Sequence, residues 1–155
     1  DPGEVVRIRL RIADGEIAVT TSSGALGERT WRSLEDDLWT QHFVTGSWNN
    51  WGFSAMTHDD ASGVYRYALR LGASGAEEFH LVIDKDWGQQ LYPDCERAEL
   101  GEGLLCGPDA DGHGLNWLIS GYAGAEVEIL FDADARDRSL AVTWREVEPP
   151  ALLRR

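Results

Sequence analysis

The sequence is poor in cysteine, in positive charge and in long hydrophobic runs. Its 155 residues include 2 Cys, and 14 Lys and Arg against 27 Asp and Glu, for a formal charge of −13. Two cysteines do not define the disulfide framework of a small secreted domain. The negative charge repels nucleic acid and anionic lipid headgroups, and no apolar run approaches the roughly 18 residues of a membrane helix. We therefore expect no nucleic-acid partner and no membrane insertion, and a neutral ligand fits this charge best.

Motifs for catalysis and for cofactor or metal binding are also missing. The sequence has no nucleophile elbow, no phosphate-binding glycine loop and no cysteine paired with a matched histidine. Segment 109–112, Asp-Ala-Asp-Gly, begins like a calcium loop, but its twelfth position is Ser120, where a bidentate Glu is required. We therefore expect no metal, no cofactor and no enzymatic activity. The chain begins Asp1-Pro2-Gly3 without an initiator methionine, so we expect it to be processed or cut from a longer chain.

Alternation of apolar and polar residues with a period of two is the main pattern in the chain. We expect strands at 40–46, 63–71, 77–84, 87–92 and 115–119, and then a terminal hairpin with arms near 127–131 and 140–143. Gly, Asp or Pro stands at each join, and the crossover helices that parallel strands need are absent. These features predict an all-β fold, an immunoglobulin-like antiparallel β-sandwich over residues 40–147 with a C-terminal tail at 148–155.

An additional N-terminal β-hairpin is expected over residues 1–21. Its first arm alternates apolar residues with Arg7, Arg9 and Arg11, which gives one apolar face and one basic face. Parts of the terminal hairpin repeat this one: Val6 matches Val127, Ile8 matches Ile129, Leu10 matches Phe131, and segment 17–20 matches segment 140–143. Either the chain opens with the last hairpin of a preceding copy in a tandem array, or the likeness is one that any two hydrophobic hairpins share.

Residues 22–39 are expected to form a linker between the hairpin and the sandwich. Within it, Trp31, Leu34 and Leu38 recur at the spacing of one helical face. This spacing predicts a short helix of two turns that docks its apolar side on the sandwich.

Segment 43–52 has an unusual composition for a strand and the loop that follows it. It reads FVTGSWNNWG, a short apolar strand that leads into Gly46 and is followed by two indoles that bracket two amides. Asn49 and Asn50 tolerate left-handed backbone and hydrogen-bond to their own main chain. We therefore expect a tight, rigid turn that presents Trp48 and Trp51 in different directions.

Three further segments follow in the chain, and their order strengthens the pattern: GVYRY at 63–67, EFHLVID at 78–84 followed by Trp87, and GLNW at 114–117. Together with segment 43–52, they resemble the starch- and glycogen-binding modules, including the glycogen-binding domain of the AMP-activated kinase β subunit. The resemblance covers about residues 40–145. It implies a non-catalytic module that binds an α-glucan, as a polysaccharide or an oligosaccharide.

Carbohydrate binding needs flat apolar faces that stack on sugar rings and side chains that hydrogen-bond to hydroxyls. The resemblance implies that Trp51 and Trp87 are the stacking platforms and that Asn116 binds a hydroxyl. His80 stands where the kinase-type module has a lysine, and an imidazole is shorter and mostly neutral at pH 7. This departure implies weaker affinity or a different ligand. Because His80 alternates with apolar neighbours, we expect it to face away from the core and to be exposed.

The other tryptophans of the sandwich have a different expected role. Trp48 lies where the family has a buried aromatic, and Trp117 and Trp144 alternate with polar neighbours in strands. We expect all three to pack in the core.

The connection at 94–113 is a second departure from the family, whose members close this gap with a short loop. It is acidic and rich in glycine. Its Cys95 and Cys106 are as consistent with a disulfide as with two reduced thiols. If this connection covers the sugar site, the alternative function is a structural or protein-interaction β-sandwich with a degenerate site, contacting other protein subunits in a larger assembly.

Overall fold

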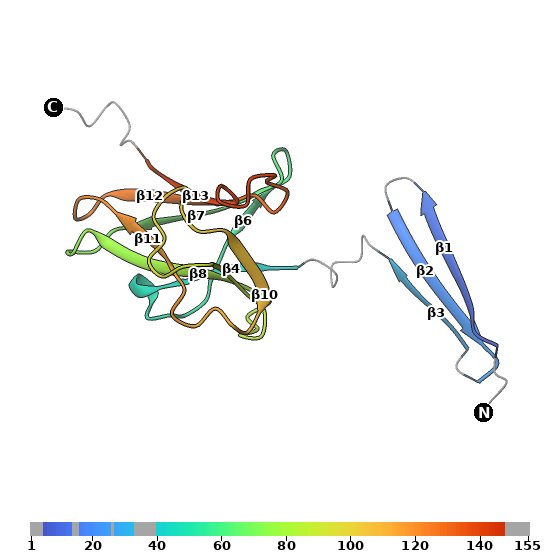
Figure 1. The fold of residues 1–155 in the computed structure, drawn as a ribbon. Coiled ribbons are helices and arrows are strands. Elements are labelled where there is room, and N and C mark those ends of the chain that lie inside the picture. Colours follow the sequence, from blue (N-terminus) through green and yellow to red (C-terminus); the bar gives the residue numbers. More distant parts are fainter. Residues whose placement is uncertain (1–4, 14–15, 26, 33–39, 148–155) are drawn as a thin grey trace. The chain divides into compact units, whose positions relative to one another are not determined.

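Strands make up nearly all of the regular structure (Figure 1). The computed structural model describes residues 5–13, 16–25, 27–32 and 40–147, so the expected tail at 148–155 lies outside the described residues. The chain divides into two compact units, Asp1–Thr40 and Gln41–Arg155. The expected all-β fold is confirmed, and every strand pair within the three sheets is antiparallel.

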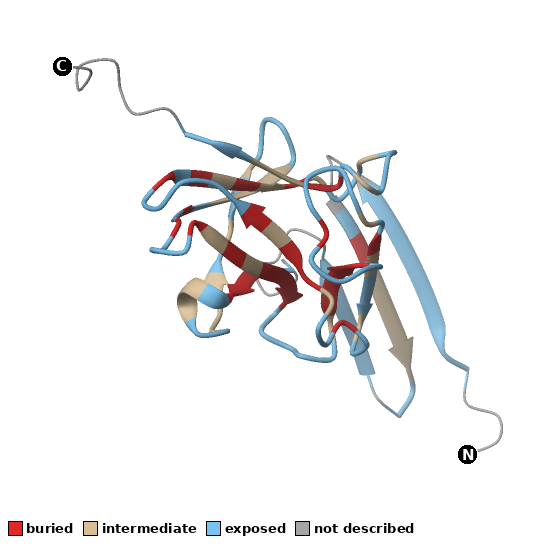
Figure 2. Ribbon diagram, turned by 60° about the vertical axis from the view of Figure 1, so that its left-hand side comes forward, coloured by how far each residue is buried: buried red, intermediate tan, exposed pale blue. Residues whose placement is uncertain are grey.

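The N-terminal unit is a three-stranded sheet in the order β1-β2-β3. Its strands are β1 (Arg7–Ala13), β2 (Glu16–Ser23) and β3 (Gly27–Arg32). The two arms of the expected hairpin are therefore β1 and β2, and its turn at 14–15 lies outside the described residues. Both faces of β1 are exposed over 7–12 (Figure 2), with Ile8, Leu10 and Ile12 on one face and arginines on the other.

Strand β3 corrects the expectation that Trp31 stands at the start of a short helix. Trp31 lies in this strand and pairs with Val19, whereas Leu34 and Leu38 lie outside the described residues. A helix of two turns is too short to be stable by itself. The segment instead pairs with β2 and completes the hydrogen bonds of its open edge.

The N-terminal hairpin and the terminal hairpin pair in equivalent registers. Leu10 lies opposite Val19, and the matching residue Phe131 lies opposite Val142. Likewise, Ile8 lies opposite Thr21 as Ile129 lies opposite Trp144. The likeness in sequence therefore extends to strand pairing, which a chance match of alternating residues does not require.

The second unit is a sandwich of two sheets. One sheet has the order β10-β9-β8-β4-β5 with β11 also paired to β8, and the other has the order β13-β12-β7-β6. In the first sheet the strands are β4 (His42–Gly46), β5 (Ser54–Ala55), β8 (Ala76–Ile83), β9 (Gln90–Pro93), β10 (Leu105–Asp109) and β11 (Trp117–Ser120). In the second they are β6 (Thr57–Asp59), β7 (Val64–Arg70), β12 (Glu126–Phe131) and β13 (Val142–Glu146).

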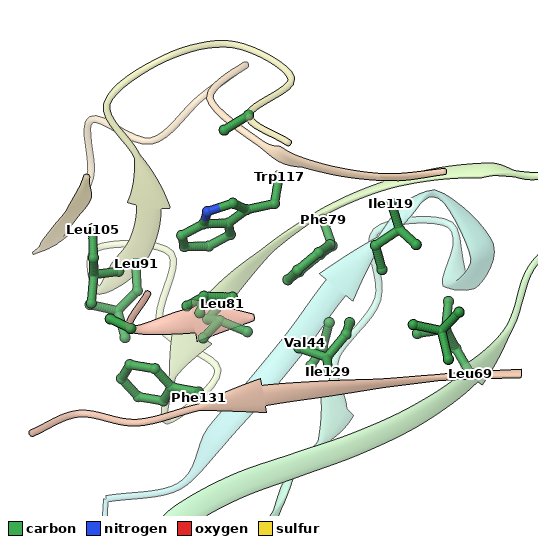
Figure 3. Close-up of a cluster of buried hydrophobic side chains, with 14 of the residues drawn as sticks. Val44, Leu69, Phe79, Leu81, Leu91, Leu105, Trp117, Ile119, Ile129 and Phe131 are labelled. Carbon is green, nitrogen blue, oxygen red and sulfur yellow. The ribbon is translucent and has the colours of Figure 1, made fainter. Parts of the chain in front are cut away.

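The core lies between these two sheets, and Figure 3 shows side chains from both meeting there. Trp117 is 1% exposed and Phe79 is fully buried, with their ring centroids 5.5 Å apart. Trp48 and Trp144 are partly buried and pack against the same cluster. The three tryptophans expected in the core therefore lie in it or against it.

Strand β8 is buried on both of its faces over residues 79–83, and its neighbours β4 and β9 are buried along their whole length. Alternation in β12 leaves Val127, Ile129 and Phe131 buried and the residues between them partly exposed. In β8, by contrast, the five residues from 79 to 83 are all buried. Something therefore covers the outer face of β8 as well as the face toward the core, and this outer face forms the candidate site.

Candidate functional site

The turn after β4 fixes the two neighbouring indoles in different directions. Asn49 Oδ1 accepts a hydrogen bond from the Gly46 amide (3.0 Å), and the amide of Trp51 donates to the Gly46 carbonyl (2.9 Å). A Cβ on Gly46 would lie 2.4 Å from the Trp48 ring, so only glycine allows that indole to cross the strand. Trp48 stacks on Tyr67 at 6.0 Å, on the core side. Trp51 has a φ of 60°, rare for a bulky residue, and is 39% exposed.

Trp87 lies in the turn between β8 and β9, also outside the core. Gln90 Nε2 donates to the carbonyl of Trp87 (2.7 Å), and Asp86 Oδ1 accepts from the amide of Gly88 (2.8 Å), so the turn is closed by its own side chains. The ring of Phe53 supports the indole at 4.9 Å. Trp87 remains 44% exposed.

His80 lies between these two indoles, and Asn116 contacts its ring. The imidazole of His80 stacks on Trp51, with centroids 5.9 Å apart and planes 28° apart. It meets Trp87 edge to face, at 6.0 Å and 63°. His80 is 6% exposed and Asn116 is 7% exposed. The expectation that His80 is exposed is therefore wrong. Its side chain does lie on the face of β8 away from the core, but the two indoles cover it there.

Hydrogen bonds determine the tautomer of His80. Asn116 Nδ2 donates to Glu78 Oε2 (3.2 Å), which leaves Asn116 Oδ1 facing His80 Nδ1 at 3.0 Å. Since Oδ1 can only accept, Nδ1 must bear the proton, and in the neutral ring Nε2 is an acceptor. This Nε2 is buried and has no hydrogen-bond partner among the described residues. A buried acceptor that is left unpaired in this way is costly.

Burial lowers the pKa of His80 below its usual value of 6.5, and the nearby His113 lowers it further, although the hydrogen bond to Asn116 opposes them. The imidazole is therefore neutral at pH 7. A lysine at this position would donate, whereas neutral His80 accepts at Nε2. Where the resemblance implies a donor at this position, His80 therefore offers an acceptor.

These side chains enclose a cavity of about 410 Å³, within the size range of small-molecule sites. It is lined by Trp51, His80, Trp87, Gln90, His113, Gly114 and Asn116. All four residues implied by the resemblance therefore line one cavity. Sequence reasoning missed three residues, namely Gln90, His113 and Gly114. His113 and Gly114 closely precede Asn116 in the chain, and this proximity in sequence was the only indication that they belong to the site.

The connection at 94–113 borders the cavity. Its strand β10 extends the sheet by pairing with β9, and its last residue, His113, contributes to the lining. Because Trp51 and Trp87 both keep more than a third of their surface exposed, the connection leaves the cavity open. Cys95 and Cys106 within it are free thiols, which settles the choice between a disulfide and reduced cysteines in this structure.

No metal site is found among the residues that the structure describes. The Asp109 carboxylate, where the calcium-like segment begins, accepts hydrogen bonds from the Tyr92 hydroxyl and from the amide of Asp111, both at 2.8 Å. Over the same described ranges, no helix has the length and apolarity needed to cross a membrane. Comparison of the chain with protein-family models, curated proteins and solved structures gives no match in any of the three.

Proposed function

We propose that the sandwich unit is a non-catalytic module that binds α-glucan chains in the cavity between Trp51 and Trp87. The observation that supports this most is the combination of two partly exposed indoles with a buried imidazole and a buried amide in one open cavity. Indole faces stack on the apolar C–H faces of sugar rings, while His80 and Asn116 hydrogen-bond to the hydroxyls at the rim of the ring.

The charge of the cavity supports a neutral ligand and a binding role. The chain has a net charge of −13, yet none of the seven residues that line the cavity is Asp, Glu, Lys or Arg. Glycoside hydrolysis uses a pair of carboxyl groups on either side of the scissile bond. A lining without a carboxylate offers no such pair, so the cavity is suited to hold a sugar chain and not to cleave it.

The angle between the indoles favours a curved chain. The planes of Trp51 and Trp87 make angles of 28° and 63° with the plane of His80, so they differ from each other by at least 35°. A flat, ribbon-like β-1,4-glucan presents its faces in nearly parallel planes. An α-1,4-glucan curves, and successive rings turn relative to one another, which matches two platforms that are not coplanar.

Titration with maltoheptaose, followed by tryptophan fluorescence and calorimetry, tests the proposal. We expect Trp51→Ala and Trp87→Ala each to lower the affinity about tenfold, because loss of one stacked indole removes roughly 1 to 2 kcal/mol of binding free energy. Trp31→Ala is the matched control, since Trp31 is 41% exposed but lies in β3 of the N-terminal unit. It should bind as wild type does.

Absence of binding to any α-glucan at millimolar concentration would reject the proposal. Cellohexaose is the selectivity control, because it presents the same rings in a flat chain. Equal affinity for cellohexaose and an α-glucan of the same length would contradict the argument from the angle between the indoles.

A second function, contact with another protein, is favoured by the N-terminal sheet. Ile8, Leu10 and Ile12 form one face of β1 and are 73%, 61% and 69% exposed. In the equivalent hairpin the matching residues Ile129 and Phe131 are buried in the sandwich core. An apolar row this exposed is typical of a surface that another β-sheet covers.

A further inference from the structure

A second hollow of about 320 Å³ adjoins Trp51. It is lined by Ser47, Trp51, Ala76, Glu78, Arg97 and Leu118. Trp51 is the one residue that lines both this hollow and the first cavity, so its indole stands as a wall between them. A chain that stacks on Trp51 therefore has a place to continue on the other side.

Glu78 contacts a residue of each hollow. Its Oε2 accepts from Asn116 Nδ2 in the first cavity (3.2 Å), and its Oε1 pairs with Arg97 Nη1 in the second hollow (2.5 Å). The pair of Arg97 and Glu78 has no net charge, so the second hollow, like the first cavity, suits a neutral ligand. A guanidinium has five N–H donors, and one bond to Glu78 leaves others for sugar hydroxyls.

The backbone holds Arg97 in place at the start of the long connection. Its φ is 51°, in the left-handed region that non-glycine residues seldom occupy. The next residue, Ala98, is 1% exposed, and both its amide and its carbonyl are hydrogen-bonded to segment 116–118. The amide donates to the Asn116 carbonyl (3.0 Å), and the carbonyl accepts from the Leu118 amide (2.8 Å). The side chain of Arg97 is nevertheless 61% exposed, and is therefore fixed at its base and free to meet a ligand.

From this geometry we infer that a second sugar subsite lies beyond Trp51, with Arg97 as its hydroxyl-binding residue and Leu118 as part of its apolar surface. The ligand class is a linear glucan long enough to pass over the Trp51 edge and occupy both hollows. The inference depends on the proposed function and goes beyond it, because it assigns a role to the inserted connection and predicts that binding depends on chain length.

The test compares maltotriose with maltoheptaose by calorimetry, on the complete chain. Wild type is expected to bind the longer glucan more tightly. Arg97→Ala should lower the affinity for maltoheptaose about fivefold, the size of one hydrogen bond from a charged, exposed donor, and leave maltotriose unchanged. Arg70→Ala is the matched control, since Arg70 pairs with Glu126 at 2.6 Å and is 69% exposed on β7, away from both hollows.

The outcomes separate this inference from the proposed function. If Arg97→Ala binds maltoheptaose as wild type does, the second subsite is rejected while the first cavity stands. If Arg97→Ala weakens both glucans equally, the subsite is also rejected, because Arg97 then acts through Glu78 and Asn116 on the first cavity. If wild type binds neither glucan, the proposed function itself fails. If Arg97→Ala unfolds thermally at the same midpoint temperature as wild type, a folding defect is excluded as the cause of any change in affinity.

Discussion

Replacing Asn116 by alanine removes the side chain that connects the buried imidazole to a carboxylate. In the native site the Asn116 amide accepts from His80 Nδ1 and donates to Glu78 Oε2. Both Asn116 and His80 are more than nine-tenths buried, so water does not readily replace the missing partner. The substitution should therefore lower the free energy of unfolding as well as glucan affinity.

The expected loss of unfolding free energy is the sum of the contributions of the two hydrogen bonds that Asn116 makes, to His80 and to Glu78. A buried His80 N–H left without an acceptor costs about 1 to 3 kcal/mol. The bond to Glu78 contributes less, about 0.5 to 1 kcal/mol, because that carboxylate keeps Arg97 as a partner and its side chain is 26% exposed. The sum is about 1.5 to 4 kcal/mol, a substantial part of the roughly 5 to 15 kcal/mol that is typical of a folded domain.

Urea unfolding followed by tryptophan fluorescence measures this loss, with the slope of free energy against urea expected to stay unchanged. Gln89→Ala is the matched control, since its side-chain amide makes only a 3.4 Å contact with Asp86 in an exposed turn, and we expect less than about 0.5 kcal/mol there. A loss below about 0.5 kcal/mol in Asn116→Ala would refute the reasoning, because the amide would then not be the acceptor that a buried imidazole requires.

Two further predictions concern pH and the N-terminal sheet. Because the pKa of His80 is lowered in the folded state, the unfolded chain binds the proton more readily, so the free energy of unfolding should fall as pH drops below 6.5 and level off below the folded pKa. Between about pH 8 and pH 5, the urea midpoint should decline less in His80→Gln than in wild type or in the exposed control His58→Gln. Equal declines in all three proteins would contradict the assignment of this pH dependence to His80. In the N-terminal sheet, Leu10→Arg should reduce binding of the dye ANS to the apolar face of β1, whereas Arg9→Gln on the opposite face should not. An ANS fluorescence signal that is unchanged in Leu10→Arg would argue against a contact surface.

Most of the strands could be predicted from the sequence because burial alternates with the pleat. Strands β4, β7, β8, β11, β12 and β13 all fall within one or two residues of the expected positions or of the arms of the expected hairpin, apart from an extension of β13 to Glu146. Within the sandwich, the strands that were missed are short or interrupted. Strands β5 and β6 have two and three residues, and β10 contains Gly107 and Pro108, so none has a run of alternation long enough to detect.

The site was predictable only in part. Local alternation correctly indicated that His80 faces away from the core, but alternation identifies a face of a strand and not what covers it. The covering rings come from Trp51 and Trp87, and the hydrogen bond comes from Asn116, 36 positions further along the chain. Gln90 likewise gains its place from the turn that it closes beneath Trp87. Such contacts are set by tertiary packing, for which a single sequence has no local signal.

Backbone strain gives a separate argument for the importance of both hollows. The described residues include five non-glycine residues with positive φ, namely Asn50, Trp51, Asp84, Lys85 and Arg97. They lie in the three segments that present Trp51, Trp87 and Arg97. Left-handed backbone at a residue other than glycine costs on the order of 1 to 3 kcal/mol, less for Asn and Asp, and persists where surrounding contacts enforce it. A chain shaped only by stability would have glycine at Trp51 and Arg97, so keeping large side chains there favours a role for these two residues in contacts beyond the fold itself.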